Sequence, residues 1–391
     1  MNQQVLDSIW KLEELWTNAI QYIDSHESSD TNEEINFQKF IVFCKDRQIE
    51  KDKSKMKIIF HIISDYYHEN NDNNDSKIVK ITKIVSLFKQ FFSEKEIFHI
   101  FISKKRLLLY FYENNIISKQ SFQEEIINLY DEIDFLQYFC IELRQLNSKE
   151  FEYRIEMNCF KDFIEENDKN IQLFMERRRK YQNISKISEI IRKDSIDEFT
   201  SFISQSNLNL NSKIENSIFE SVTKEVSLED LTLIEYAAFF GSQSIFKFLL
   251  LSDVKITTDL FLCAIHGGNY EIIHLIENCK IKVNHNDYIR YYDEAIKCHQ
   301  NEIAFYIEEN YLKENIEISS IEISIAFHNI QMLIHILKNH SNCITKKKDF
   351  NIFFYNLCGF GYTEIVDSIL KSIDYDILHE KDEKINQIIY F

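Results

Sequence analysis

The stretch LTLIEYAAFFGSQSIFKFLLL, Leu231–Leu251, decides between two folds for the second half of this chain. Undivided, it is one apolar helix; divided at Gly241, it is two short antiparallel helices joined by a tight turn. Gly241 favours the pair, because glycine adopts the left-handed conformation that ends a helix without steric cost. Thr232 followed three residues later by Glu235 is a capping box, which predicts where the first helix begins.

The same pattern recurs along the chain. The segments AIHGGNYEIIHLIE, AIKCHQNEIAFYIE, SIAFHNIQMLIHIL and LCGFGYTEIVDSIL align with AAFFGSQSIFKFLL, and IIRKDSIDEFTSFI aligns more weakly upstream. The alignment defines six hinge positions: Asp194, Gly241, Gly268, His299, His328 and Gly361. They are 47, 27, 31, 29 and 33 residues apart. A period near 30 residues is typical of helix pairs that stack on one another, because one pair alone cannot bury its apolar face.

Two local details support the pairs. Ser319 followed by Glu322 predicts a second capping box, three pairs after the first. Small residues on the first helices, among them Ala237 and Ala264, predict close approach between the two helices of a pair.

Composition favours an all-α fold. The 391 residues include no proline and only five glycines, so both common breakers of helices and strands are scarce. All five glycines lie in the C-terminal half, which indicates that the two halves of the chain differ in how their helices are built and joined. We expect an N-terminal helical domain over residues 1–183, a repeat domain of about six helix pairs over 184–376, and a C-terminal tail over 377–391.

Charge and cysteine usage restrict the partners and the compartment. The formal net charge is −18, and such a field disfavours nucleic acid and anionic membranes as partners. The eight cysteines form no C-x-x-C pair, and the first residues lack the pattern of a signal peptide. We therefore expect reduced thiols and a cytoplasmic location.

One basic run stands out in this acidic chain: ERRRK, Glu176–Lys180. It predicts either a nuclear-localisation or partner patch at Arg177–Lys180, or a solvated helix face that pairs with acidic neighbours such as Glu165 and Glu166.

The segment Thr232–Leu250 resembles an ankyrin repeat, whose signature is T-P-L-H-x-A-A-x-x-G-H-x-E-I-V-x-x-L-L. Thr232, Ala237, Ala238 and Gly241 are among the matching positions, whereas Leu233 replaces the usual proline and Glu235 the usual histidine. The resemblance covers roughly residues 184–376. More loosely, the whole chain is similar to a large uncharacterised ankyrin-type family expanded in certain protists. The resemblance implies a stack of helix pairs and says nothing about the partner.

In ankyrin-type stacks, the residues just before each hinge face the concave groove that binds partners. The resemblance therefore implies a protein-binding role for this set: Phe239, Phe240, His266, Lys297, Phe327 and Phe360. Exposed aromatic side chains are good anchors for a protein surface. The alternative is that Phe239, Phe327 and Phe360 pack against adjacent repeats.

Catalytic and metal patterns are weak. The HGG of His266–Gly268 resembles the oxyanion-hole glycines of esterases, but the chain has no G-x-S-x-G, and we interpret it as a hinge. The GFGYTE of Gly359–Glu364 is likewise interpreted as a hinge. Cys298, His299, His328 and His335 show no compact spacing of four ligands, so buried thiols and surface imidazoles are the simpler interpretation. We expect no cofactor, no metal and no catalytic residue.

The sequence thus predicts a non-catalytic scaffold that binds a protein partner. Two alternatives stay open: an enzyme or regulatory subunit with a site in the N-terminal half, and an effector that acts on another organism's proteins.

Overall fold

The structure is a computed structural model that describes residues 3–25, 30–68, 74–129, 133–144, 170–220, 226, 230–279, 281–313, 316–340 and 347–372. Within these ranges the regular elements are helices, with one isolated bridge between Lys213 and Thr232. The predicted all-α class is confirmed.

The chain forms two compact units, residues 1–66 with 284–391 and residues 67–283. The predicted boundary between residues 183 and 184 lies inside the second unit and stays a prediction, and the predicted tail, 377–391, lies outside the described residues.

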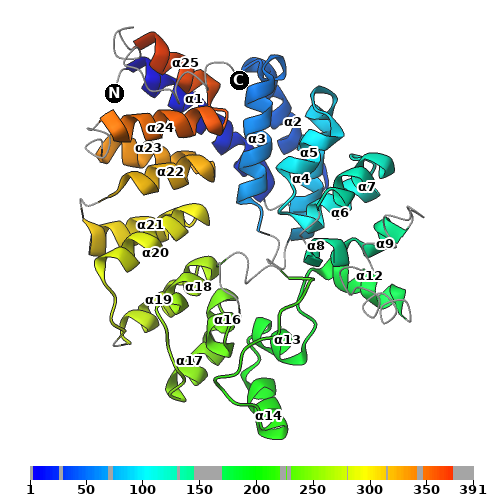
Figure 1. The fold of residues 1–391 in the computed structure, drawn as a ribbon, viewed down its shortest axis with the longest axis vertical. Helices are drawn as coiled ribbons and strands as arrows, with labels where there is room; N and C mark the ends of the chain where they lie inside the picture. Colours follow the sequence, from blue (N-terminus) through cyan, green and yellow to red (C-terminus); the bar gives the residue numbers. More distant parts are fainter. Residues whose placement is uncertain are drawn as a thin grey trace. The chain divides into compact units, whose positions relative to one another are not determined.

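The first unit combines both ends of the sequence (Figure 1). Its N-terminal elements are α1 (Gln3–Asp24), α2 (Asp30–Asp46), η1 (Ile49–Lys51) and α3 (Lys53–Tyr66). Its C-terminal elements are α20 (His285–Lys297), α21 (Asn301–Ile307), the π-helical turn η3 (Glu308–Leu312), α22 (Ile318–Ala326), α23 (Ile330–Asn339), α24 (Lys347–Gly359) and α25 (Thr363–Ser372).

The second unit lies between these segments in sequence. It begins with α4 (Asn74–Phe88), η2 (Lys89–Phe91), α5 (Glu94–Ile100), α6 (Lys105–Glu113), α7 (Lys119–Ile127), α8 (Ile133–Tyr138), α9 (Cys140–Arg144) and α12 (Ile171–Lys180). It continues with α13 (Lys186–Arg192), α14 (Ile196–Ser206), α16 (Leu233–Phe239), α17 (Gln243–Leu251), α18 (Asp259–Gly267) and α19 (Tyr270–Glu277).

From α13 onward the helices form pairs joined by the same turn. In every pair one turn residue has a positive φ: Asp194 (49°), Gly241 (66°), Gly268 (60°), His299 (56°), His328 (50°) and Gly361 (80°). These are the six predicted hinge positions. The turn is closed by backbone hydrogen bonds, such as that from Ser242 N–H to Ala237 O at 2.9 Å. The stretch Leu231–Leu251 is therefore two helices.

Three hinges lack glycine, and their left-handed backbone is unfavourable by about 1–2 kcal/mol each. Neighbouring contacts offset this at two of them. The Asp194 carboxylate accepts the N–H groups of Ser244 and Ile245 at 2.9 Å each, at the start of α17. The His328 ring lies 2.8 Å, Nδ1 to Oδ2, from Asp65. These side chains connect the turn to an adjacent element.

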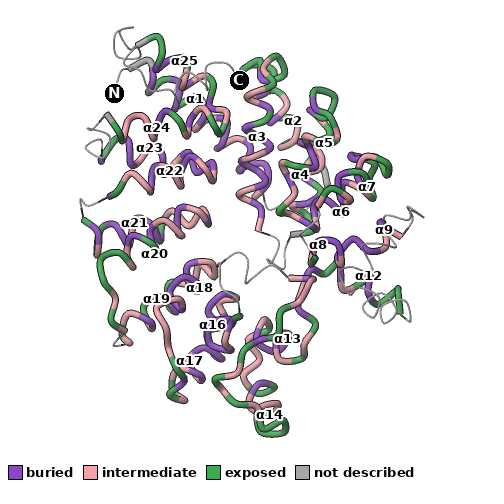
Figure 2. Tube along the Cα trace, viewed as in Figure 1, coloured by how far each residue is buried: buried purple, intermediate pink, exposed green. Residues whose placement is uncertain are grey.

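Within each unit, successive pairs pack through their first helices. α16 contacts α13 and α18 in the second unit, and α22 contacts α20 and α24 in the first. Polar contacts repeat at the sequence period: Asn329 donates to Ile296 O at 2.8 Å, and Asn356 donates to Glu322 at 3.0 Å. α16 is buried along its whole length, as Figure 2 shows for its purple trace. The period near 30 residues thus corresponds to real contacts between neighbouring pairs.

Of the two capping boxes predicted in the repeats, that of Thr232 and Glu235 forms. Glu235 N–H donates to the Thr232 hydroxyl and Thr232 N–H donates to the Glu235 carboxylate, at 3.4 and 2.9 Å. The predicted box of Ser319 and Glu322 is wrong, because α22 begins two residues earlier than the box requires, with Glu317 at its N-cap and no side-chain cap. Glu322 instead accepts the hydrogen bond from Asn356 of the following pair.

One very close contact lies between neighbouring pairs, and the predicted close approach within a pair stays a prediction. A Cβ atom added to Gly267, the last residue of α18, would be 2.3 Å from the carbonyl oxygen of Ala238 on α16. No side chain larger than hydrogen fits at this contact.

Gly267→Ala should therefore lower the free energy of unfolding by about 2–3 kcal/mol, because the backbone of α16 must move away. Gly359→Ala is the matched control, since Gly359 also ends the first helix of a pair but has no atom within 4 Å of the added Cβ. That variant should be neutral or more stable by up to about 1 kcal/mol. Urea unfolding of both variants tests this, and equal losses in the two would contradict the close contact.

Candidate functional site

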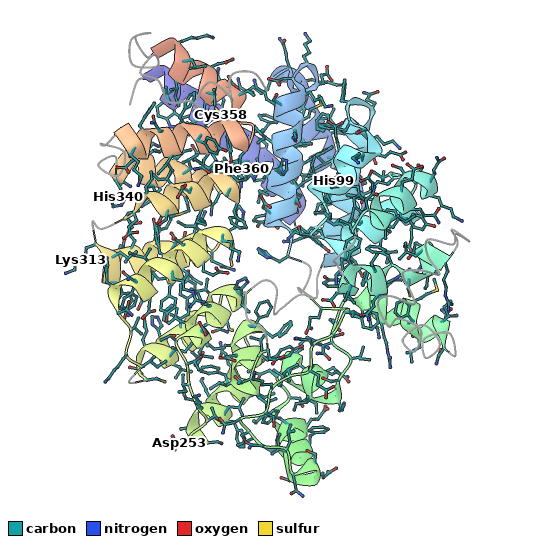
Figure 3. The ribbon with its side chains drawn as sticks, in the orientation of Figure 1. His99, Asp253, Lys313, His340, Cys358 and Phe360 are labelled. Carbon is teal, nitrogen blue, oxygen red and sulfur yellow. The ribbon has the colours of Figure 1, made fainter. Side chains whose placement is uncertain are left out.

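The predicted binding residues lie at the hinge ends of the pairs, meaning the last residues of each first helix and the turn after them. They contact one another across neighbouring pairs. The rings of Phe239 and His266 stack with centroids 5.3 Å apart, and the Lys297 ammonium lies 5.8 Å from the Phe327 ring centroid. Phe360 lies at the hinge end of α24 and α25 (Figure 3), 6.2 Å from the ring of His328. Within each unit, the hinge ends thus form connected surfaces.

The second unit carries an aromatic cluster at its hinge ends, formed by Tyr236, Phe239, Phe240 and His266. Phe240 packs on Tyr236 and Phe239 with centroids 4.7 and 5.1 Å apart. Phe239 is only 7% exposed, which favours a packing role for it. Phe240 and His266 are half-buried, so part of each ring stays accessible.

A buried polar network fixes the back of this cluster. Arg192 donates to Glu220 at 3.0 Å and to the Tyr236 hydroxyl at 2.6 Å, and its guanidinium lies 5.7 Å from the Phe240 ring centroid. Burial and the neighbouring Glu220 raise the pKa of Tyr236 well above its ordinary value, so the phenol stays neutral. The Phe240 ring is therefore placed on a rigid base.

In the first unit, α3 of the same chain occupies the hinge ends. His61 stacks on His328 with centroids 5.0 Å apart and an interplanar angle of 4°, and Asp65 lies 2.8 Å from the same imidazole. Lys55 pairs with Glu364 at 3.0 Å. Aromatic stacking and ion pairs are the contacts by which these hinge ends hold a helix.

α1 adds a second helix to this surface. Trp16 stacks on His299 with centroids 6.4 Å apart, Lys11 pairs with Glu364 at 2.9 Å, and Ser8 shares a 2.7 Å hydrogen bond with Ser368. The sequence did not indicate these contacts, because they join residues more than 250 positions apart. The repeat pattern located the hinges but carried no signal for what covers them.

The other motifs have structural roles. Gly268 and Gly361 are hinge residues with positive φ, as interpreted for HGG and GFGYTE. Cys298 is buried, which confirms the thiol prediction. His328 is also buried, so its prediction as a surface imidazole is wrong: its ring packs between His61 and Tyr362.

The basic run does not form a continuous exposed patch. The Arg178 side chain is 2% exposed and makes two hydrogen bonds with the buried Glu142 carboxylate, at 2.7 and 3.0 Å. The exposed Arg179 pairs with Glu113 at 3.0 Å. Glu165 and Glu166, the predicted partners, lie outside the described residues. Arg178 therefore connects α12 to α9 and is not available to a receptor.

Comparisons with models of protein families, with curated proteins and with solved structures found no match to this chain. Across the described ranges, each helix falls short of the length and apolar character that crossing a bilayer requires.

Arg178→Met should lower the free energy of unfolding by about 3–5 kcal/mol, because it leaves the Glu142 carboxylate buried without its cation. Arg179→Met removes the same charge from an exposed side chain. It should change the free energy of unfolding by less than about 1 kcal/mol. Thermal or urea unfolding measures both. Equal, small effects would show that the whole basic run is a solvated face.

Acid should weaken the contact of α3 with the hinge ends. Burial and the neighbouring His328 lower the pKa of His61 from 6.5 to about 4, against the opposing effect of Asp65. Between pH 6.5 and about pH 4, the unfolded chain binds a proton at His61 that the folded chain does not. The free energy of unfolding therefore falls as the pH falls. The His61 contribution to this loss is about 2 kcal/mol between pH 7.5 and pH 5.

Urea unfolding at about pH 7.5 and about pH 5 measures the effect, and His61→Gln should remove that part of the pH dependence. His274→Gln, which removes an exposed imidazole on α19, is the control for the loss of any histidine. The interpretation fails if the wild type and His61→Gln lose the same stability on acidification.

Proposed function

We propose that this chain is a non-catalytic scaffold of ankyrin type that binds helices of a protein partner at its hinge ends. The observation that carries the proposal is the pair of helices, α1 and α3, already bound to the hinge ends of the first unit. They bind through stacked rings at His299 and His328 and through two lysines on Glu364. The same positions in the second unit carry the aromatic cluster of Tyr236, Phe239, Phe240 and His266.

The chemistry of this cluster suits a protein surface. Half-buried aromatic rings on a rigid base lose little conformational entropy on binding and bury a large apolar area. Arg192 is buried and paired with Glu220, so it supports the cluster from behind and the accessible face is apolar. A helix with an apolar stripe fits this arrangement.

Site-specific photocrosslinking in the native cell tests this proposal. A photoreactive phenylalanine analogue replaces Phe240 in one variant and Leu251 in another. Leu251 is 87% exposed at the far end of α17, so it is a matched control on the same helix pair. The expected result is a defined protein adduct at position 240 and none at position 251. Equal adducts at both positions, or none at position 240, would contradict the proposal.

The captured partner then allows a quantitative test. Phe240→Ala should weaken binding of that partner by about 30-fold or more, as removal of a central aromatic anchor does. Leu251→Ala should leave the affinity unchanged. A loss of several kcal/mol in folding stability in Phe240→Ala, with unchanged affinity per folded molecule, would show that Phe240 is a core residue.

A further inference from the structure

Three metal-ligating side chains meet where the pair α20/α21 contacts the pair α22/α23. The ligand atoms of Glu308, His335 and His340 all lie within 4.8 Å of one another. The Glu308 carboxylate lies 2.9 and 3.1 Å from His335 Nε2, and 2.7 Å from His340 Nε2. His340 is labelled in Figure 3, at the end of α23. All three residues belong to the first unit.

The backbone that carries Glu308 is unusual. Glu308 begins the π-helical turn Glu308–Leu312, and its carbonyl oxygen accepts the N–H of Lys313, five residues on, at 2.7 Å. Such wide turns often mark functional positions, because they redirect side chains that a regular helix would place elsewhere. His335 lies on α23, and His340 caps the end of that helix with a 2.8 Å hydrogen bond to Ile336 O. One helix and its C-cap residue thus hold both imidazoles against an irregular segment.

The cluster is polar but well enclosed. The side chains of Glu308, His335 and His340 are 11%, 24% and 8% exposed. Burial acts to raise the pKa of Glu308, but hydrogen bonds from His335 and His340 outweigh it and lower that pKa. The carboxylate is therefore ionised at neutral pH, and His335 is the most exposed of the three side chains.

We propose that Glu308, His335 and His340 form a binding site for a divalent transition-metal ion, with Zn²⁺ as the best fit. Two imidazoles and one carboxylate are a ligand set that zinc uses in proteins, with a fourth position left to water. Tetrahedral ligands at about 2.0–2.1 Å from the ion lie about 3.3 Å apart. The distances of 2.7–3.1 Å from the Glu308 carboxylate to the two imidazoles are shorter than this by about 0.2–0.6 Å, and all the ligand atoms lie within 4.8 Å of one another, so small side-chain movements admit the ion.

The surrounding groups fit the proton changes that binding requires. Each imidazole must present the lone pair of Nε2, so its proton moves to Nδ1. The Asn339 carboxamide lies 3.0 Å from His335 Nδ1, and a turn of that carboxamide presents its oxygen as the acceptor. Tyr292 donates to Glu308 Oε2 at 2.9 Å and orients the carboxylate. Both ligand types thus have outer partners.

The sequence carries no local signal for this site, because its ligands are not closely spaced along the chain. Glu308 lies 27 residues before His335 and 32 before His340. Those separations are near the repeat period, and the stack brings such residues side by side. The site is independent of partner binding at the hinge ends, and its ion would join two neighbouring pairs.

Calorimetric titration of the full-length, metal-stripped chain with ZnCl₂ tests the proposal. The expected result is one high-affinity equivalent in the wild type. His335→Gln and Glu308→Gln should each weaken it by more than about 100-fold, because loss of a ligand exceeds the 10–100-fold effect of losing an outer partner. His274→Gln removes an imidazole that lies 2.9 Å from Glu277 on an exposed helix face, and should bind Zn²⁺ as the wild type does.

Two further measurements guard against a variant that fails to fold. Zn²⁺ should protect His335 of the wild type from diethyl pyrocarbonate while His274 keeps reacting, as peptide mass spectrometry can show. Co²⁺ in place of Zn²⁺ should give the visible absorption of a tetrahedral site in the wild type. Unprotected His335 at saturating Zn²⁺, or equal zinc affinity in the wild type and a folded His335→Gln variant, would overturn the proposal.

Discussion

A single residue with positive φ between two short helices is the constraint on which the rest of this structure depends. It reverses the chain direction at Gly241 and at five equivalent positions. Because the chain reverses every 30 residues or so, the first helices of neighbouring pairs lie against one another within each unit, and Gly267 permits one very close contact of this kind. The turn therefore sets the period, and the period sets which residues meet.

The period explains the polar contacts as well as the core. Asn329 reaches back to Ile296, and Ser320 reaches back to Asp293 at 2.5 Å, each about one repeat along the chain. The Glu308, His335 and His340 cluster obeys the same spacing. Packing, polar contacts between pairs and a candidate ion site thus all follow from one geometric repeat.

Much of this could be predicted from the sequence, for physical reasons. Hinges were identifiable because glycine and a few polar residues tolerate positive φ, and the Thr232–Glu235 capping box is a local signal. The Ser319–Glu322 box failed because a capping motif says where a helix can begin, whereas packing against Asp293 and Asn356 decides where it does. The contacts of Trp16 and His61 with the hinge ends could not be predicted, since local patterns carry no information about residues so distant in sequence.

The most direct test of the repeated turn is amide hydrogen exchange on the folded chain. The N–H groups of Ser242, Gln300, Asn329 and Tyr362 each donate at 2.9 Å to a carbonyl of the preceding helix, across the hinge. If the turn is closed, these four amides exchange as slowly as those inside the flanking helices. Exchange at the rate of exposed loop amides, beside protected helices, would contradict it, because the pairs would then be joined by open linkers and not by a closed left-handed turn.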